Sequence, residues 1–177
     1  LDSPRLRIDD HTITLTRPHR WTSTLPIGAE SLAVGQLGGS DPPAPEDLTN
    51  ALGLVEDHVT TATLEHDDLV GAARLVLEGE HAVTIARVEI GADDVPSGFV
   101  LTRDAAEDVF RTLATEAERD RAHNPGLPAG EVRAVVGTAV IVVAAMRRLH
   151  LSDVIIDTEL TSADTPGGSA PSDGGGS

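Results

Sequence analysis

The sequence has no cysteine and no lysine, and each absence excludes a class of chemistry. Without cysteine there is no disulfide, no thiol nucleophile and no thiolate metal site. All 13 basic residues are arginine, so Schiff-base catalysis and a phosphate-loop lysine are excluded as well. Arginine without lysine, among abundant Ala, Gly, Asp and Val, is typical of a GC-rich bacterial genome.

Aromatic residues are also scarce, at 2% of the chain: Trp21, Phe99 and Phe110. The core must therefore be built from Leu, Val, Ile and Ala, and stacking platforms for bases or sugars are nearly excluded. The formal charge of -16 repels polyanions, which argues against nucleic acid or an anionic membrane surface as a partner. We expect a soluble, cytosolic protein.

No apolar run is long enough to cross a membrane. The longest, Ala134 to Met146, has 13 uncharged residues, whereas a span needs roughly 20. It is closed by Arg147 and Arg148 and followed by the strand-like segment 153–157. A helix that is apolar on every side must be covered all round, so this pairing predicts a layered α/β domain.

The remaining periodicity predicts strands interleaved with helices. We expect a hairpin over 5–8 and 12–15, a third strand over 21–25 and a short helix over 28–34. Further along, we expect an amphipathic helix over 46–62, a buried strand over 68–74, a second hairpin over 75–77 and 83–90, and a helix over 103–118 with Thr102 as its N-cap. This order predicts a mixed sheet with helices on its faces.

The length of 177 residues corresponds to one domain, which we place at residues 1–160. The tail over 161–177 carries almost no apolar residues, and we expect it to be disordered. Because the chain opens on Leu1 in the middle of a pattern, we expect an N-terminal part to be missing.

Three landmarks resemble the second half of the exopolyphosphatase and guanosine pentaphosphate phosphohydrolase (Ppx/GppA) family. They are Leu25 to Ala29 (LPIGA), Leu69 to Gly71 (LVG), and the stretch from Gly126 through Gly137 that opens the apolar helix. The resemblance covers about residues 1–160. It implies an actin-like, ribonuclease-H-type domain, the second of two that enclose a catalytic cleft, and Mg²⁺ as the cofactor of any hydrolysis of polyphosphate or guanosine pentaphosphate.

The sequence departs from the family at four phosphate or metal features. Only Asp2 matches a functional position, as a weak candidate for phosphate or metal binding, and Ser3-Pro4-Arg5 follows it where the family has a glycine-rich run. The LVG segment continues as Ala-Ala-Arg-Leu75 instead of a glycine-threonine loop. Ser31 replaces an arginine, and Gly130 and Val132 replace an Arg-x-Asp pattern. The family's amide cradle for phosphate is therefore not expected to form.

Other polar residues are assigned structural roles. Glu65 to Asp68 is interpreted as a solvated turn, and Glu78 to His81 as a hairpin turn, in preference to metal or acid-base groups. Five histidines lack metalloenzyme spacing and are interpreted as isolated surface residues: His11, His19, His58, His123 and His150. Arg147 and Arg148 are expected to cap the negative end of their helix. No catalytic residue is identified, since Ser23, Ser31 and Thr138 have no recognisable base.

Three hypotheses follow. The first is a divergent Ppx/GppA half-domain that is inactive by itself, with a missing N-terminal domain or a second copy as its partner. The second is a non-catalytic interaction or regulatory module on the same scaffold. The third is a truncated gene product whose active cleft is supplied upstream.

Overall fold

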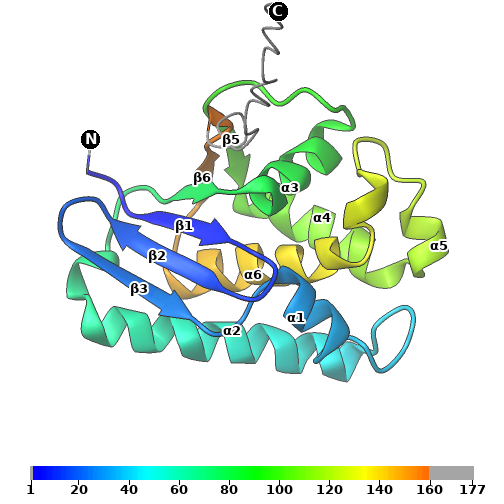
Figure 1. The fold of residues 1–177 in the computed structure, drawn as a ribbon, viewed down its shortest axis with the longest axis horizontal. Helices are drawn as coiled ribbons and strands as arrows, with labels where there is room; N and C mark the ends of the chain where they lie inside the picture. The colour runs from blue at the N-terminus through cyan, green and yellow to red at the C-terminus, as the bar shows by residue number, and fades with distance from the viewer. Residues whose placement is uncertain (1, 160–177) are drawn as a thin grey trace, which may run out of the picture.

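The computed structural model describes residues 2–159, which form one mixed sheet with helices packed against it (Figure 1). The tail that we expect to be disordered, 161–177, lies outside the described residues, so that expectation stays a prediction. No helix within residues 2–159 combines the length and the apolar composition needed to span a bilayer.

The sheet has six strands in the order β3-β2-β1-β4-β6-β5. Their bounds are β1 Arg5–Ile8, β2 Ile13–Arg17, β3 Trp21–Leu25, β4 Val76–Glu78, β5 Phe99–Thr102 and β6 Asp153–Ile156. The first three strands form an antiparallel meander, β1, β4 and β6 are parallel to one another, and β5 returns antiparallel to β6. The predicted mixed sheet flanked by helices is confirmed.

Helix α6 forms the centre of the helical layer. The α-helices are α1 Ala29–Val34, α2 Pro45–Glu65, α3 Glu80–Ile90, α4 Arg103–Thr115, α5 Glu118–Arg121 and α6 Ala134–Arg148, and two short 3-10 turns lie at Asp67–Leu69 and Ala129–Glu131. All residues of α6 from Ala134 to Met146 are buried, because α1, α2, α3 and α4 all pack against it. The predicted helix that is covered on every side is confirmed.

Burial alternates along the strands. In β1 and β6 every second side chain is buried and the others are half-buried, so one face of the sheet lies on the helical core. Figure 1 shows α6 running behind the first three strands, with α2 alongside. The core is almost entirely aliphatic, as the scarcity of aromatic residues predicts.

Two predictions for the middle of the chain are wrong. Residues 68–74 contain no strand, since the 3-10 turn Asp67–Leu69 leads into an irregular segment before β4. Segment 83–90 is the body of α3, although its β-branched residues favour a strand. Tertiary packing overrides that propensity, because residues from His81 to Ala86 are buried on several sides of the helix. The sequence also gave no indication of β5 or α5.

Candidate functional site

A hollow of about 470 Å³ lies where β1 and β4 end. These two strands are parallel neighbours, so their carboxyl ends meet at one edge, which is where ligands bind in open α/β sheets. The hollow is lined by residues 7–12, which lead from β1 into β2, and by Glu80, His81 and Glu131. We define these residues as the strand-end hollow.

The buried imidazole of His81 joins the two sides of this hollow. His81 lies in the first turn of α3 and is 6% exposed. Its Nε2 is 2.8 Å from Oδ1 of Asp10, and its Nδ1 is 2.8 Å from Oε2 of Glu131. A protonated imidazole can donate to both carboxylates at once. Burial alone would lower the pKa of His81, but the hydrogen bonds and charges of Glu131 and Asp10 outweigh burial and raise it.

The turn between β1 and β2 is fastened to the start of α1. The amide of Ala29 donates to the carbonyl of Asp9, and the amide of Ser31 donates to the carbonyl of Asp10, both at 3.0 Å. Gly28 makes this approach possible, since a Cβ there would lie 2.5 Å from backbone atoms of Asp9, Asp10 and His11. The LPIGA landmark is therefore a backbone clamp on the turn, and these two helix amides are already occupied.

The second connection at the hollow begins at Gly79, which links β4 to α3. Its φ of 97° lies in the region that favours glycine, and a Cβ there would lie 3.0 Å from the carbonyl oxygen of Ile8. Glu78 to His81 is thus a strand-to-helix turn, and its interpretation as a hairpin turn is wrong. The strand followed by a glycine turn therefore lies at β4 and Gly79, and not at Leu69 to Leu75.

Asp2 lies at the other end of β1. It precedes the strand, its side chain is 54% exposed, and its Oδ2 is 3.7 Å from Nε of Arg17. The bend that follows β1 is formed by residues 9–12. Pro4 is not in a bend, since its carbonyl accepts from Val76 in the pairing of β1 with β4. Asp2 therefore stays a weak candidate. Arg17 also lies 3.3 Å from Oδ2 of Asp68, so it links Asp2 to the residue that precedes the LVG segment.

The departures at Ser31 and at Gly130 and Val132, and the landmark glycine Gly137, each have a local structural setting. The hydroxyl of Ser31 accepts from the amide of Gly28 at 2.8 Å and so closes the first turn of α1. Gly130 is exposed in the 3-10 turn that carries Glu131, and Val132 is buried. Gly137 is packed against the backbone of Ala29, which places it near the clamp and away from Asp2.

The donor set of the hollow does not fit a protein-held Mg²⁺. Asp10 and Glu131 each direct an oxygen at His81, and Oδ1 of Asp9 is 3.0 Å from Nε of Arg7. Magnesium prefers octahedral oxygen ligation. Across residues 2–159, no group of three or more His, Asp or Glu side chains is arranged to hold a metal ion.

The segment 65–68 is a turn with Glu65 and Asp67 exposed, as predicted, but its other two residues, His66 and Asp68, are held by contacts. The carboxylate of Asp68 accepts from Nε1 of Trp21 and from Arg20, each at 3.0 Å, and the indole stacks on His66 with ring centroids 4.0 Å apart. Burial would raise the pKa of Asp68, but the hydrogen bond from Trp21 and the nearby arginines lower it. The cluster fastens the end of α2 to the meander.

Arg147, Arg148 and four of the five histidines lie outside the strand-end hollow, whereas His11 lines it. Arg147 pairs with Glu107 of α4 at 3.0 Å and Arg148 donates to Thr60 of α2, so both tie the end of α6 to its neighbours. Four of the five histidines that we interpreted as surface residues are exposed, and His58 is half-buried.

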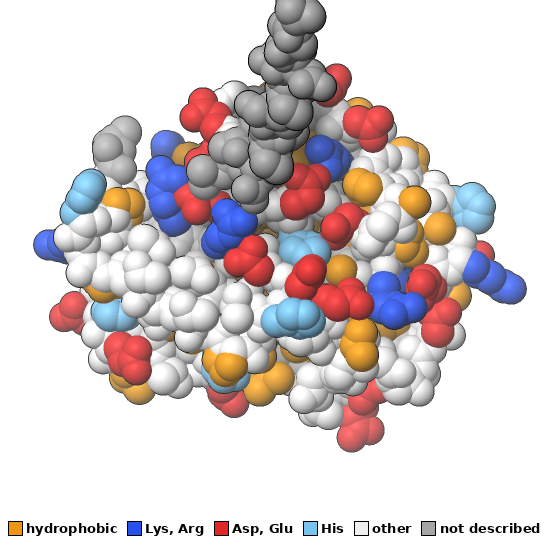
Figure 2. All heavy atoms as spheres, in the orientation of Figure 1, with side chains coloured by type: hydrophobic (Ala, Val, Ile, Leu, Met, Phe, Trp, Pro, Cys, Tyr) orange, Lys and Arg blue, Asp and Glu red, His pale blue; other side chains and the backbone are white. Residues whose placement is uncertain are grey.

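Sequence reasoning missed the residues that form the centre of the hollow. His81 is 71 positions from Asp10 and 50 from Glu131, so no local spacing connects them. The only signal is His81 itself, which opens a run of residues that are mostly apolar. Figure 2 shows carboxylate and histidine side chains gathered near the middle of the visible face, with few arginines among them.

No protein-family model matches the sequence, and no curated protein matches it either. Solved structures do match. An exopolyphosphatase-like protein aligns with a TM-score of 0.80 at 15% identity, over 89% of this chain and 56% of its own. A Ppx/GppA phosphatase of Aquifex aeolicus aligns with a TM-score of 0.77 at 15% identity, over 89% and 54%. An exopolyphosphatase of Cytophaga hutchinsonii aligns with a TM-score of 0.74 at 12% identity, over 88% and 53%. The chain therefore has the actin-like fold of the Ppx/GppA proteins and spans about half the length of those it matches.

Proposed function

We propose that this chain is a non-catalytic domain on the Ppx/GppA fold, which does not hydrolyse phosphoanhydride bonds by itself. The observation that carries the proposal is the strand-end hollow, where a buried histidine bridges two carboxylates at the position that a substrate would enter. The matching structures include an exopolyphosphatase and a Ppx/GppA phosphatase, so phosphoanhydride hydrolysis is the reaction with which we test the proposal.

Charge at the hollow disfavours a polyanion. Four carboxylates line it, from Asp9, Asp10, Glu80 and Glu131, against one arginine, Arg7, and the histidines. Arg7 is already paired with Asp9 at 3.0 Å. Since the whole chain carries a formal charge of -16, neither the local nor the long-range field attracts polyphosphate.

The backbone amides at the start of α1 do not replace the missing cations. A phosphate held at a helix start or in a nest needs N–H groups that are free to donate. At α1, the amides of Ala29 and Ser31 donate to the β1–β2 turn, and that of Gly28 donates to the Ser31 hydroxyl. The amides at the start of α1 are therefore committed to internal contacts.

A phosphate-release assay tests the proposal. The purified chain is incubated with polyphosphate and millimolar Mg²⁺, beside the Aquifex aeolicus Ppx/GppA phosphatase as a positive control. We expect no release above the buffer blank. Turnover of several per second by the chain, abolished by chelating the Mg²⁺, would contradict the proposal.

A second candidate function is a half-site enzyme, favoured by the chain's coverage of only about half of the matching structures. In that case the chain would hydrolyse phosphoanhydrides, with Mg²⁺, only when a second domain or a second copy completes the cleft. Adding the sequence encoded upstream and repeating the assay separates the two. Activity in the extended protein would favour the half-site enzyme. A lack of activity in the extended protein would favour the regulatory or interaction module.

A further inference from the structure

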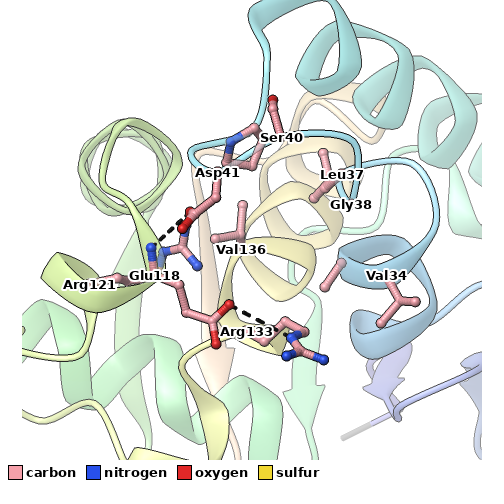
Figure 3. Close-up of a pocket in the computed structure, with 11 residues that line it drawn as sticks. Val34, Leu37, Gly38, Ser40, Asp41, Glu118, Arg121, Arg133 and Val136 are labelled. Carbon is pink, nitrogen blue, oxygen red and sulfur yellow. Dashed lines mark hydrogen bonds and ion pairs between the residues drawn. The ribbon is translucent and has the colours of Figure 1, made fainter.

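A second pocket, of about 440 Å³, opens between the end of α1, the loop before α2, and the start of α6 (Figure 3). It shares no lining residue with the strand-end hollow. Its volume is in the range of small-molecule sites, which combine an apolar surface with a few convergent polar groups. We call it the α1–α6 pocket.

One wall of this pocket is apolar. Leu37 and Val136 are buried, and Val34 at the end of α1 is 58% exposed. Val34 is one of five large hydrophobic side chains with such exposure among the described residues. An aliphatic group that enters the pocket would cover Val34 and contact the other two, which favours binding through burial of apolar surface.

The opposite wall carries both signs of charge. Arg121 is 3% exposed, and its guanidinium donates to the carbonyls of Leu113, Val132 and Glu116 at 2.8 to 3.0 Å. No carboxylate of residues 2–159 pairs with it. Burial lowers the pKa of Arg121, although the charges of Asp41, Glu118 and Glu116 act in the opposite direction.

Arg133 is the cation that can move. Its side chain is 59% exposed, and its Nε is 3.8 Å from Oε2 of Glu118. An exposed pair at this distance contributes little energy, so a ligand carboxylate can take the place of Glu118. Figure 3 shows the Glu118 carboxylate between the two guanidinium groups.

Asp41 and Glu118 supply the complementary acceptors. Oδ1 of Asp41 accepts from the amide of Glu118 at 2.8 Å, which holds the loop against α5 and leaves the second carboxylate oxygen for a ligand donor. A simple anion would be attracted by the arginines and repelled by these carboxylates. A ligand with an ammonium and a carboxylate group on the same carbon atom would satisfy both.

We propose that the α1–α6 pocket binds a small zwitterion with an aliphatic body, of which a free aliphatic α-amino acid is the simplest example. The carboxylate pairs with Arg133, the ammonium group with Asp41 and Glu118, and the side chain lies on Val34, Leu37 and Val136. This site is independent of the proposed function, since it uses no residue of the strand-end hollow.

The test is an NMR titration of the ¹⁵N-labelled chain with leucine and three compounds that each lack one of its features. Leucine carries all three features, 4-methylpentanoate lacks the ammonium group, 3-methylbutylamine lacks the carboxylate, and serine lacks the aliphatic body. We expect leucine to shift the amides of Val34, Leu37, Arg133 and Val136 in a saturable manner, and each of the other compounds to bind at least about tenfold more weakly.

Two variants locate the effect. Arg133→Gln removes an exposed side chain and should weaken leucine binding by about tenfold or more, whereas Arg119→Gln, which changes an 87% exposed arginine outside the pocket, should leave it unchanged. No saturable shift at the pocket with leucine would overturn the proposal. Equal binding of leucine and 4-methylpentanoate, or unchanged binding in Arg133→Gln, would overturn it as well.

Discussion

Gly137 of α6 lies against the carbonyl group of Ala29, so closely that a Cβ at residue 137 would be 2.1 Å from that oxygen. The contact lets α1 and α6 approach at the level of their backbones. Since the amide of Ala29 also donates to Asp9, the same residue fastens the β1–β2 turn. The absence of a side chain at Gly137 thus allows α6 to lie close to α1, and through α1 to the β1–β2 turn that lines the strand-end hollow.

We expect Gly137→Ala to lower the free energy of unfolding by about 2 kcal/mol or more, because the added methyl group must push two backbones apart. Chemical denaturation measures the change. Gly53→Ala in α2 is the matched control, since nothing lies within 4 Å of a Cβ there, and it should stabilise the helix by about 1 kcal/mol. Equal effects of the two substitutions would refute the close contact.

The His81 bridge predicts how stability depends on pH. The pKa of His81 is raised in the folded state, so the bridge stabilises the fold fully below the unfolded pKa of about 6.5, and this contribution is lost as pH rises through the folded pKa. Urea unfolding from about pH 6 upward should show the wild type losing stability relative to His81→Gln. His123→Gln, at an exposed site, should keep the wild-type profile. A wild-type profile parallel to that of His81→Gln would contradict the bridge.

Thr84 and Thr138 form a natural pair for testing buried polarity. Both are 0% exposed in helices, but the hydroxyl of Thr84 has no hydrogen-bond partner, whereas that of Thr138 donates to the carbonyl of Ala134 at 3.2 Å. We expect Thr84→Val to raise the free energy of unfolding by about 1 kcal/mol, because it removes an unpaired polar group. Thr138→Val should be neutral or slightly destabilising. Thermal unfolding distinguishes the two, and a loss of stability in Thr84→Val would count against this account.

Arg121 is expected to be essential for the fold. Replacing it by methionine would leave three carbonyls, two of them buried, without their donor, at a cost of about 3 kcal/mol or more in the free energy of unfolding. Arg119→Met, two residues earlier on the same short helix and 87% exposed, should change it by less than about 0.5 kcal/mol. Circular dichroism during denaturation measures both. Similar stabilities would show that the guanidinium is dispensable.

Much of the fold could be predicted from the sequence, because in several elements the spacing of apolar residues agrees with the pattern of burial in the structure. The apolar stripe of α2, the uniformly apolar α6 and the alternating meander each present one consistent pattern. The Thr102 cap is also confirmed, since its hydroxyl accepts from the amide of Ala105 at 3.2 Å. Local sequence patterns were sufficient to predict these elements.

The strand-end hollow could not be predicted, because its parts are joined only by topology. His81, Asp10 and Glu131 come from three separate segments, and the register of β1 against β4 decides that they meet. The error over α3 has the same origin. Its β-branched residues favour a strand locally, and only the packing of its buried faces against α6 and the sheet makes it a helix.

The parallel pairing of β1 with β4 has a consequence for how the chain folds. Arg5 lies opposite Val76 and Leu6 opposite Leu77, so the centre of the sheet forms only after a loop of about seventy residues has closed. Contacts this distant in sequence slow folding. We expect the β1–β3 meander and α2 to gain structure early, and the rate-limiting step to be the arrival of β4.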